Sequence, residues 1–249
     1  MKLRARDWGF IALIIVVTLV TIRLGFWQLS RHTERKALNE EIVGRLDQPL
    51  LNLTNVEITP ADLEYRRVSL EGEFDSEHAI LLKNRARLGQ PGYHLVTPLQ
   101  LMDQDEAILV DRGWIPLVNS AKAGRGVYQR TNPVLVEGIV RLSQPEPVWD
   151  FLADSVPEGG EDPLETWRLL NIEGIQGQIP YTLLPISITQ TNNLTGEPPI
   201  PEPEIDLSEG THLGYAIQWF SFTVVAVVGG FFWLKRKQSK PPSDKKRAR

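Results

Sequence analysis

An uncharged run of 22 residues, 213–234, constrains this 249-residue chain more than any other feature. About 20 helical residues cross the hydrocarbon core of a bilayer, so the run is long enough to span a membrane as one helix. His212 precedes the run, and Tyr215 and Trp219 follow it at spacings of three and seven residues. On a helix these three side chains share one face. The sequence therefore predicts a transmembrane helix over 212–234 with a histidine at its mouth.

A second apolar run occupies residues 9–29 and follows a short basic segment. A cleaved signal peptide begins in the same way, but it ends in small residues spaced for cleavage. Here Arg23, Trp27 and Gln28 stand at that place instead. We therefore expect an uncleaved transmembrane helix over 9–29, with Arg23 reaching toward the membrane surface.

The charges that flank the second run predict its orientation. The tail 235–249 carries eight Lys or Arg against one Asp, whereas the segment before the run is acidic. Cytoplasmic flanks of membrane helices are enriched in Lys and Arg. We therefore expect cytoplasmic tails at 1–8 and 235–249, with the rest of the chain outside the cytoplasm. Basic tails around an acidic middle favour the lipid bilayer as a partner and argue against nucleic acid.

Between the two runs the pattern changes from helical to extended. Apolar residues four apart predict a helix over 33–48. Seven later segments, separated by Gly, Pro or Asp/Asn, are predicted strands. They are 67–74, 79–82, 93–99, 107–114, 134–142, 167–172 and 181–191. Their spacing indicates a mostly antiparallel, barrel-like domain over 30–190.

The remaining segments are predicted to connect these elements. Residues 122–130 are interpreted as a helix or a loop, and 153–163 as an acidic loop. Residues 191–211 are rich in proline and acids without apolar periodicity, which is typical of a semi-rigid linker. The expected fold is an α+β membrane protein in which two transmembrane helices flank an extracytoplasmic β domain.

The sequence lacks the common signatures of catalysis. It contains no phosphate-binding glycine loop, no G-x-S-x-G elbow and no H-E-x-x-H motif. It has no cysteine, which excludes thiolate metal sites and cysteine nucleophiles, and its four histidines are not spaced as metal pairs. We therefore expect a protein that is not an enzyme.

Candidate binding residues gather where the two apolar runs meet the outer surface of the membrane. An imidazole can ligate heme iron, aromatic rings pack against the macrocycle, and arginine pairs with propionates. The same residue types also anchor helices at membrane surfaces, so a heme site and a simple lipid anchor both remain open. The six candidates are Trp27, Gln28 and Arg31 in the first run and His212, Tyr215 and Trp219 in the second.

Five sequence blocks, in the same order, resemble the Surfeit locus protein one family of assembly factors for heme-copper cytochrome c oxidase. The blocks are 24–31, 67–74, 89–99, 108–116 and 212–220. The resemblance covers nearly the whole chain. It implies a protein that binds heme a, with His212 as the iron ligand, and assists heme insertion into the catalytic subunit of the oxidase. Heme a synthase is a further candidate partner. The alternative is a membrane scaffold that holds an oxidase assembly intermediate without a cofactor.

Two residues depart from the family pattern. The family often has Asn where this chain has Gly210, two residues before the histidine, and again where it has Asp111. Arg112-Gly113-Trp114, which follows Asp111, is predicted as a tight turn after a strand. Its tryptophan is expected to anchor the domain to the membrane surface or to the core. A contact with heme or with the oxidase is the alternative function of this tripeptide.

The position of the first apolar run gives the expected location. It begins by residue 9, which leaves no room for a mitochondrial transit peptide. The expectation is a bacterial plasma membrane protein that crosses the bilayer twice.

Overall fold

The computed structural model describes residues 4–53, 59–102, 105–121, 125–130, 132–145, 154, 163–192, 196–201 and 205–238. The chain divides into two compact units, each of which is described by itself. The first consists of Met1–Glu41 with Asp206–Arg249, and the second of Ile42–Ile205.

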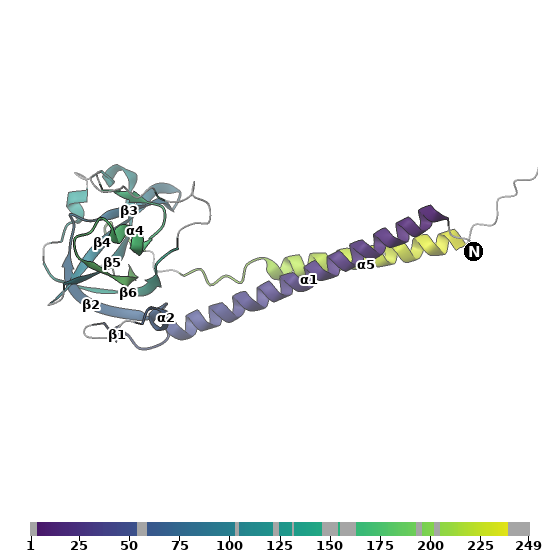
Figure 1. Ribbon diagram of the computed structural model, residues 1–249, viewed down its shortest axis with the longest axis horizontal. Helices are drawn as coiled ribbons and strands as arrows, with labels where there is room; N and C mark the ends of the chain where they lie inside the picture. The colour runs from purple at the N-terminus through teal and green to yellow at the C-terminus, as the bar shows by residue number, and fades with distance from the viewer. Residues whose placement is uncertain are drawn as a thin grey trace, which may run out of the picture. The chain divides into compact units, whose positions relative to one another are not determined.

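The first unit is built on two long helices that lie side by side, α5 (His212–Gln238) and the part of α1 (Ala5–Leu46) that ends at Glu41 (Figure 1). Each contains a stretch that is long and apolar enough to cross a membrane, and most of that stretch is exposed on the protein. The predicted helix over 33–48 is confirmed as a continuous extension of α1. The two helices run antiparallel, because Phe10 near the start of α1 packs against Trp233 near the end of α5.

A seven-residue repeat forms the seam between these helices. The less exposed side chains recur in alternating steps of four and three residues along both α1 and α5. In α1 they are Ile14, Thr18, Thr21, Gly25, Gln28, His32, Arg35 and Asn39, and in α5 they are His212, Ala216, Trp219, Thr223, Ala226, Gly230 and Trp233. Such a repeat keeps one face of a helix toward its partner along the whole contact. Several of these residues are small, which lets the two backbones approach closely.

Polar contacts fix the alignment of the two helices. The hydroxyl oxygens of Thr21 and Thr223 lie 2.7 Å apart in the middle of the seam. Lys237 forms an ion pair with Asp7 at the end where α1 begins. A shift of one helix along the other would separate both pairs at once, so they define one register.

The segment before α5 runs along the second half of α1. Arg35 donates hydrogen bonds to the backbone oxygens of Asp206 and Ser208, at 3.1 and 3.2 Å. Asn39 donates to the backbone oxygen of Leu207 at 2.5 Å. These side chains satisfy the carbonyl groups of a segment that has no helix or strand of its own.

The second unit is built on a mixed β-barrel (Figure 1). Its five closed strands are β2 (Arg67–Phe74), β6 (Val134–Leu142), β8 (Thr182–Gln190), β5 (Glu106–Pro116) and β4 (Gln90–Leu101), in that order, and a pairing of β4 with β2 closes the ring. β3 (Ile80–Arg87) and the short β7 (Thr166–Trp167) extend the sheet beside β4, and β1 (Leu51–Asn52) lies beside β2. The predicted barrel is thus confirmed, but three pairings, including β5 with β8, are parallel.

Strand β5 is buried on both of its faces. Ile108 and Val110 pack into one core cluster, whereas Ala107 and Leu109 pack into another. Successive side chains of a strand point to opposite faces, so a run of four apolar residues is what a doubly covered strand requires. This makes β5 the central strand of the second unit.

Short helices complete the described part of this unit. They are α2 (Pro60–Leu63), α4 (Ile172–Gln176) and two single 3₁₀ turns, Leu117–Asn119 and Gly126–Tyr128. The 3₁₀ turn at 126–128 falls within the segment predicted as a helix or loop, of which 122–124 lie outside the described residues. Most of the predicted acidic loop at 153–163 also falls among residues that are not described.

The predicted strand over 167–172 is wrong. Only Thr166 and Trp167 are extended, and α4 begins at Ile172. The side chain of Asn171 accepts a hydrogen bond from the backbone nitrogen of Gly174, which caps the new helix. The apolar residues of 167–172 therefore enter the core from a turn and a helix rather than from one strand.

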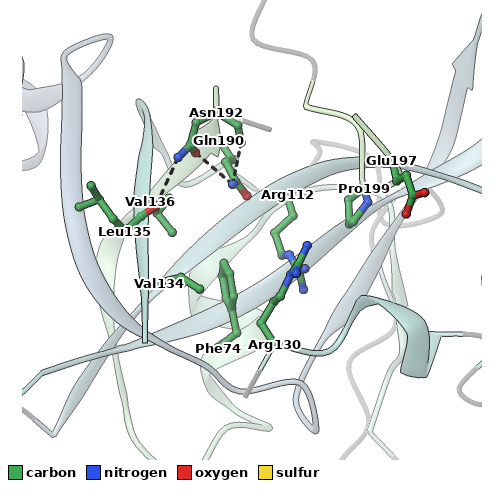
Figure 2. Close-up of a pocket in the computed structure, with 10 residues that line it drawn as sticks. All are labelled: Phe74, Arg112, Arg130, Val134, Leu135, Val136, Gln190, Asn192, Glu197 and Pro199. Atoms are coloured by element: carbon green, nitrogen blue, oxygen red, sulfur yellow. Dashed lines mark hydrogen bonds between the residues drawn. The ribbon is translucent and has the colours of Figure 1, made fainter. Parts of the chain in front are cut away.

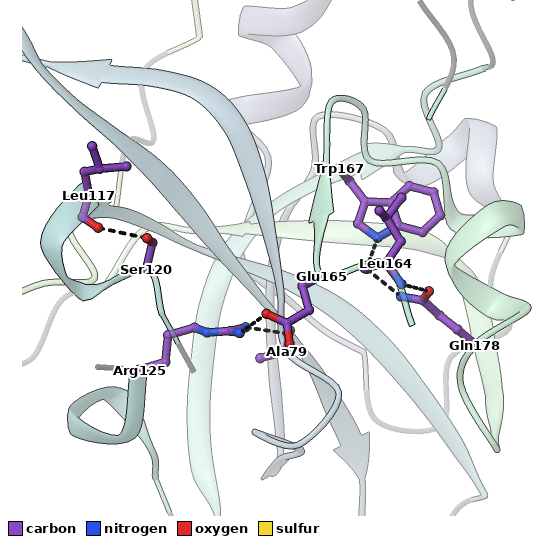
Figure 3. A network of polar contacts seen from close by, with 8 residues as sticks. All are labelled: Ala79, Leu117, Ser120, Arg125, Leu164, Glu165, Trp167 and Gln178. Carbon is purple, nitrogen blue, oxygen red and sulfur yellow. Dashed lines mark hydrogen bonds and ion pairs between the residues drawn. The ribbon is translucent and has the colours of Figure 1, made fainter. Parts of the chain in front are cut away.

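A buried arginine ties the region around β7 to the barrel (Figure 3). Arg125 donates to the backbone oxygen of Ala79 at 3.0 Å and to the carboxylate of Glu165 at 2.6 Å. Nearby, the indole nitrogen of Trp167 donates to the backbone oxygen of Leu164 at 2.8 Å. The bonds of Arg125 hold Glu165 beside the residue before β3, and the indole bond closes the turn that leads into β7, which pairs with β3.

The tripeptide Arg112-Gly113-Trp114 lies inside β5, so the predicted turn after a strand is wrong. Gly113 has a φ of +107°, which glycine adopts far more readily than other residues. This bend brings Trp114 into backbone pairing with Ile200, at 2.8 and 2.9 Å. Trp114 is 5% exposed, so it belongs to the protein interior. The same pairing attaches part of the predicted linker to the barrel.

A polar cluster joins the end of β2 to the start of β8. The hydroxyl of Tyr181 donates to the carboxylate of Asp75 at 2.7 Å, and a ring nitrogen of His78 lies 2.6 Å from the same oxygen. Burial alone would raise the pKa of Asp75, but these two contacts outweigh burial and lower it below its ordinary value. Burial and the nearby carboxylate raise the pKa of Tyr181.

Disulfide trapping tests the register of the helix pair in a chain that has no cysteine of its own. We expect Thr21→Cys combined with Thr223→Cys to form an intramolecular disulfide under mild oxidation, because the two side chains touch. Protease cleavage between the helices, followed by non-reducing electrophoresis, should show the two fragments linked. Val20→Cys with Thr223→Cys is the control, because Val20 is exposed. Equal linkage in both pairs would contradict the seam.

Removing the Tyr181 hydroxyl tests the polar cluster. We expect Tyr181→Phe to lower the free energy of unfolding by about 1 kcal/mol, which is about 2–4 °C in melting temperature. The folded-state pKa of Asp75 is lowered, so its stabilisation is present at neutral pH and is lost as pH falls below about 4. The difference between the two proteins should therefore shrink in acid.

The matched control for this substitution is Tyr93→Phe. Tyr93 is a partly buried tyrosine of the same unit, and its hydroxyl makes no hydrogen bond among the residues that the structure describes. Thermal unfolding of Tyr93→Phe should match that of the unsubstituted protein at every pH. A pH-independent loss in Tyr181→Phe would show that packing, not the carboxylate contact, sets the effect.

Candidate functional site at the start of helix α5

The side chains of Gln28 and His212 meet across the helix seam. The amide oxygen Oε1 of Gln28 lies 2.8 Å from the ring nitrogen Nδ1 of His212. Gln28 is 9% exposed, so its side chain is almost completely buried between the two helices. Two of the six residues predicted from the sequence are thus in direct contact, although 184 positions separate them in the chain.

This contact selects one form of the imidazole. An amide oxygen accepts a hydrogen bond, so Nδ1 of His212 donates it, and in the neutral imidazole this leaves the lone pair on Nε2. Histidines that ligate metals usually have their second nitrogen bonded to an acceptor in this manner, which fixes the ring orientation. The arrangement can therefore present Nε2 as a ligand.

The backbone before His212 explains the first departure from the family pattern. Gly210 has a φ of +70°, in the left-handed region. A side chain at this position would have its Cβ 3.4 Å from Cδ2 of the His212 ring, which is ordinary contact. Glycine adopts this conformation most easily, and asparagine is among the few other residues that do. Gly210 and an Asn at this position can thus adopt the same backbone conformation.

The aromatic candidates differ in their placement. Trp219 occupies the seam and packs edge-on against Phe222, with ring centroids 5.8 Å apart. Trp27 and Tyr215 are exposed, at 53% and 50% of their surfaces. The structure therefore leaves two aromatic side chains on the outside of the helix pair near His212.

Arg31 is engaged on its own helix. Its guanidinium forms an ion pair with Glu34 at 2.7 Å, and both side chains are exposed. Arg31 follows Gln28 by three residues, as Tyr215 follows His212. In an antiparallel helix pair, residues that follow a seam position by the same number of residues in each helix lie on the same side of the seam. Arg31 and Tyr215 thus occupy one flank of the seam.

His32 is a neighbour of this site that the sequence analysis missed. It lies one helical turn beyond Gln28 in the α1 seam, and its Nε2 is 3.7 Å from the carboxylate of Glu209. Its Nδ1 is buried and has no hydrogen-bond partner in the described part of the chain. The seven-residue spacing of polar residues within and beyond the first apolar run was the signal that could have identified it.

In the barrel unit, Asp111 gives the second departure a structural role. Its carboxylate lies 2.9 Å from Nδ1 of His94 and accepts a hydrogen bond from the backbone nitrogen of Gly113 at 3.0 Å. It therefore supports the bend in β5. Among the described residues, no group of three or more His, Cys, Asp or Glu side chains is arranged to hold a metal ion.

Comparisons with known proteins identify relatives of this chain. The family model described as the SURF1 family matches residues 15–224, which include the barrel and part of each long helix. A SURF1-like protein of Monosiga brevicollis is 29% identical over 93% of this chain and 90% of its own length. A SURF1-like protein of Rickettsia felis is 27% identical over 87% of this chain and 93% of its own length.

A vertebrate protein extends the range of this likeness. Surfeit locus protein 1 of Xenopus tropicalis is 22% identical over 90% of this chain and 74% of its own length. The family match covers most of the chain, including Gln28 and His212. The chain therefore belongs to the SURF1 family.

Proposed function

We propose that this protein is a cytochrome c oxidase assembly factor that binds heme a beside His212 and assists its insertion into the catalytic subunit. The SURF1 family is known generally as a family of cytochrome oxidase assembly factors rather than of enzymes. The observation that carries the heme proposal is the contact between Gln28 and His212, because it leaves Nε2 of the imidazole able to ligate iron.

The other candidates supply the remaining contacts that a heme requires. Tyr215 and Trp27 offer exposed aromatic surface, and Trp219 backs it from the seam. Arg31 is available for a propionate once it leaves Glu34, and an exposed ion pair of this kind contributes only about 0–1 kcal/mol. When bound, heme a supplies an iron centre that accepts an imidazole nitrogen. The protein contributes the orientation of that nitrogen.

The same proposal includes a location and partners. The two apolar helices would span a bacterial plasma membrane, with both termini in the cytoplasm and the barrel outside it. Their length and composition support this, as do the basic residues at the end of α5. The catalytic subunit of the oxidase and heme a synthase would be the protein partners.

Heme content measures the role of His212. We expect the full chain, co-expressed with a heme a synthesis pathway, to be purified with heme and to show its absorption spectrum. His212→Ala should lose most of that heme, because the proposed iron ligand is removed. Gln28→Leu should weaken binding about 10–100-fold, since the orienting contact is lost. His78→Asn, in the barrel, is the control and should leave the spectrum unchanged. A full heme complement in His212→Ala would rule out the assigned ligand.

A cofactor-free scaffold is the second candidate, and the tight seam favours it. Ala216 is buried one turn beyond His212, and the side chain of Phe220 occupies the space that a Cβ on Gly25 would need. Direct packing of this kind gives a stable helix pair without any cofactor. On this hypothesis the contact between Gln28 and His212 serves only to align the helices.

Co-purification separates the two candidates. If the protein is a scaffold, oxidase subunits should be recovered with it from cells that cannot make heme a, and in equal amount with His212→Ala. If heme transfer is its role, recovery should fall in both cases. Immunoblotting of the purified complex against the catalytic subunit gives the measurement.

A further inference from the structure

Two arginines line a cavity of about 130 Å³ in the barrel unit (Figure 2). Arg112 comes from the central strand β5 and Arg130 from the segment before β6. Their guanidinium groups point toward one another, and Phe74 lies beside them (Figure 2). The cavity is remote in sequence from the candidate site on α5 and lies in the other compact unit.

Arg112 is almost completely buried, with 5% of its surface exposed. One guanidinium nitrogen donates to the backbone oxygen of Tyr128 at 2.8 Å, and the group stacks over the ring of Phe74 at 4.5 Å. Burial, with a smaller effect from Arg130, lowers the pKa of Arg112 to about 10. The group remains charged at neutral pH, so a buried cation faces the cavity.

No carboxylate neutralises this pair in the described part of the chain. Glu197 also lines the cavity, but no ion pair joins it to Arg112 or Arg130 there. Buried charges are normally paired, because an unpaired one loses its hydration without compensation. Of this pair only Arg112 is buried, and its hydrogen bond goes to a neutral carbonyl, so with the exposed Arg130 beside it the cavity forms an incomplete site that attracts an anion.

We propose that this cavity binds a carboxylate carried on a small apolar group. The fork of one guanidinium group matches the two oxygens of a carboxylate through parallel hydrogen bonds, and two such groups line this cavity. Part of the remaining wall is apolar, at Phe74, Val134 and Val136, which suits a short hydrocarbon portion. The cavity admits a ligand of a few non-hydrogen atoms, such as the end of a longer molecule. This role is independent of heme binding and of the helix pair.

Butyrate is the probe for this site, with acetate and inorganic phosphate as comparisons at constant ionic strength and pH 7. We expect butyrate to bind the full chain in detergent more tightly than either, as measured by titration calorimetry and by a rise in melting temperature. Arg130→Gln should weaken butyrate binding about tenfold or more, because one of the two forks is lost. Preference for phosphate over both carboxylates would overturn the proposed ligand class.

Arg67→Gln is the matched control, since Arg67 is exposed on β2 and has the same charge. It should bind butyrate as the unsubstituted protein does. Equal weakening in Arg67→Gln and Arg130→Gln would mean that overall charge, not the cavity, attracts the anion, and would overturn the proposal. Absence of butyrate binding to the unsubstituted protein would do the same.

Arg112→Lys adds a test of geometry at unchanged charge. Lysine keeps the cation but lacks the planar fork, so binding should fall while the far-ultraviolet circular dichroism spectrum stays the same. Undiminished butyrate binding in this variant would contradict the proposal. Because Arg130 is exposed, the Arg130→Gln result remains decisive even if Arg112→Lys fails to fold.

Discussion

The seam between α1 and α5 is the constraint on which the candidate site depends. Three polar pairs lie along its seven-residue repeat: Asp7 with Lys237, Thr21 with Thr223, and Gln28 with His212. A polar group left without its partner in apolar surroundings lowers stability by about 1–3 kcal/mol. A shift in helix register would leave several such groups without partners at the same time. The pairs therefore contribute specificity of alignment more than strength, while the small residues between them contribute close packing. The position of the His212 ring is a consequence of that alignment.

The barrel depends in a comparable way on β5. This strand is covered on both faces, pairs antiparallel with β4 and parallel with β8, and contains the bend at Gly113. The bend allows Ile200 to pair with Trp114, and the carboxylate of Asp111 holds it in place. Arg112, between these residues, is buried by the same arrangement. Apolar packing does not explain a charged side chain such as Arg112 on β5, a strand that is buried on both faces.

Much of this architecture could be predicted from the sequence where a local pattern determines it. β2 and β6 begin and end at the predicted residues, and the periodicity beyond the first apolar run predicted the extension of α1. Partner choice could not be predicted, because alternation along a strand does not reveal whether its neighbour, here β8 beside β5, runs parallel. The error at 167–172 arose because Asn171 caps a helix within an apolar run. At the site, the predicted position of both residues at the outer membrane surface correctly placed Gln28 near His212. It did not reveal that Arg31 forms an ion pair with Glu34.

The left-handed backbone of Gly210 bears on how this chain can diverge from its relatives. Position 210 selects for a backbone angle, and glycine and asparagine both satisfy it. Replacement of glycine by asparagine at this position, or the reverse, leaves the start of α5 at His212 unchanged and can occur by neutral drift. A β-branched residue would instead strain the turn and displace the imidazole from Gln28. The backbone angle at position 210 therefore limits which residues are tolerated there, whatever the polarity of their side chains.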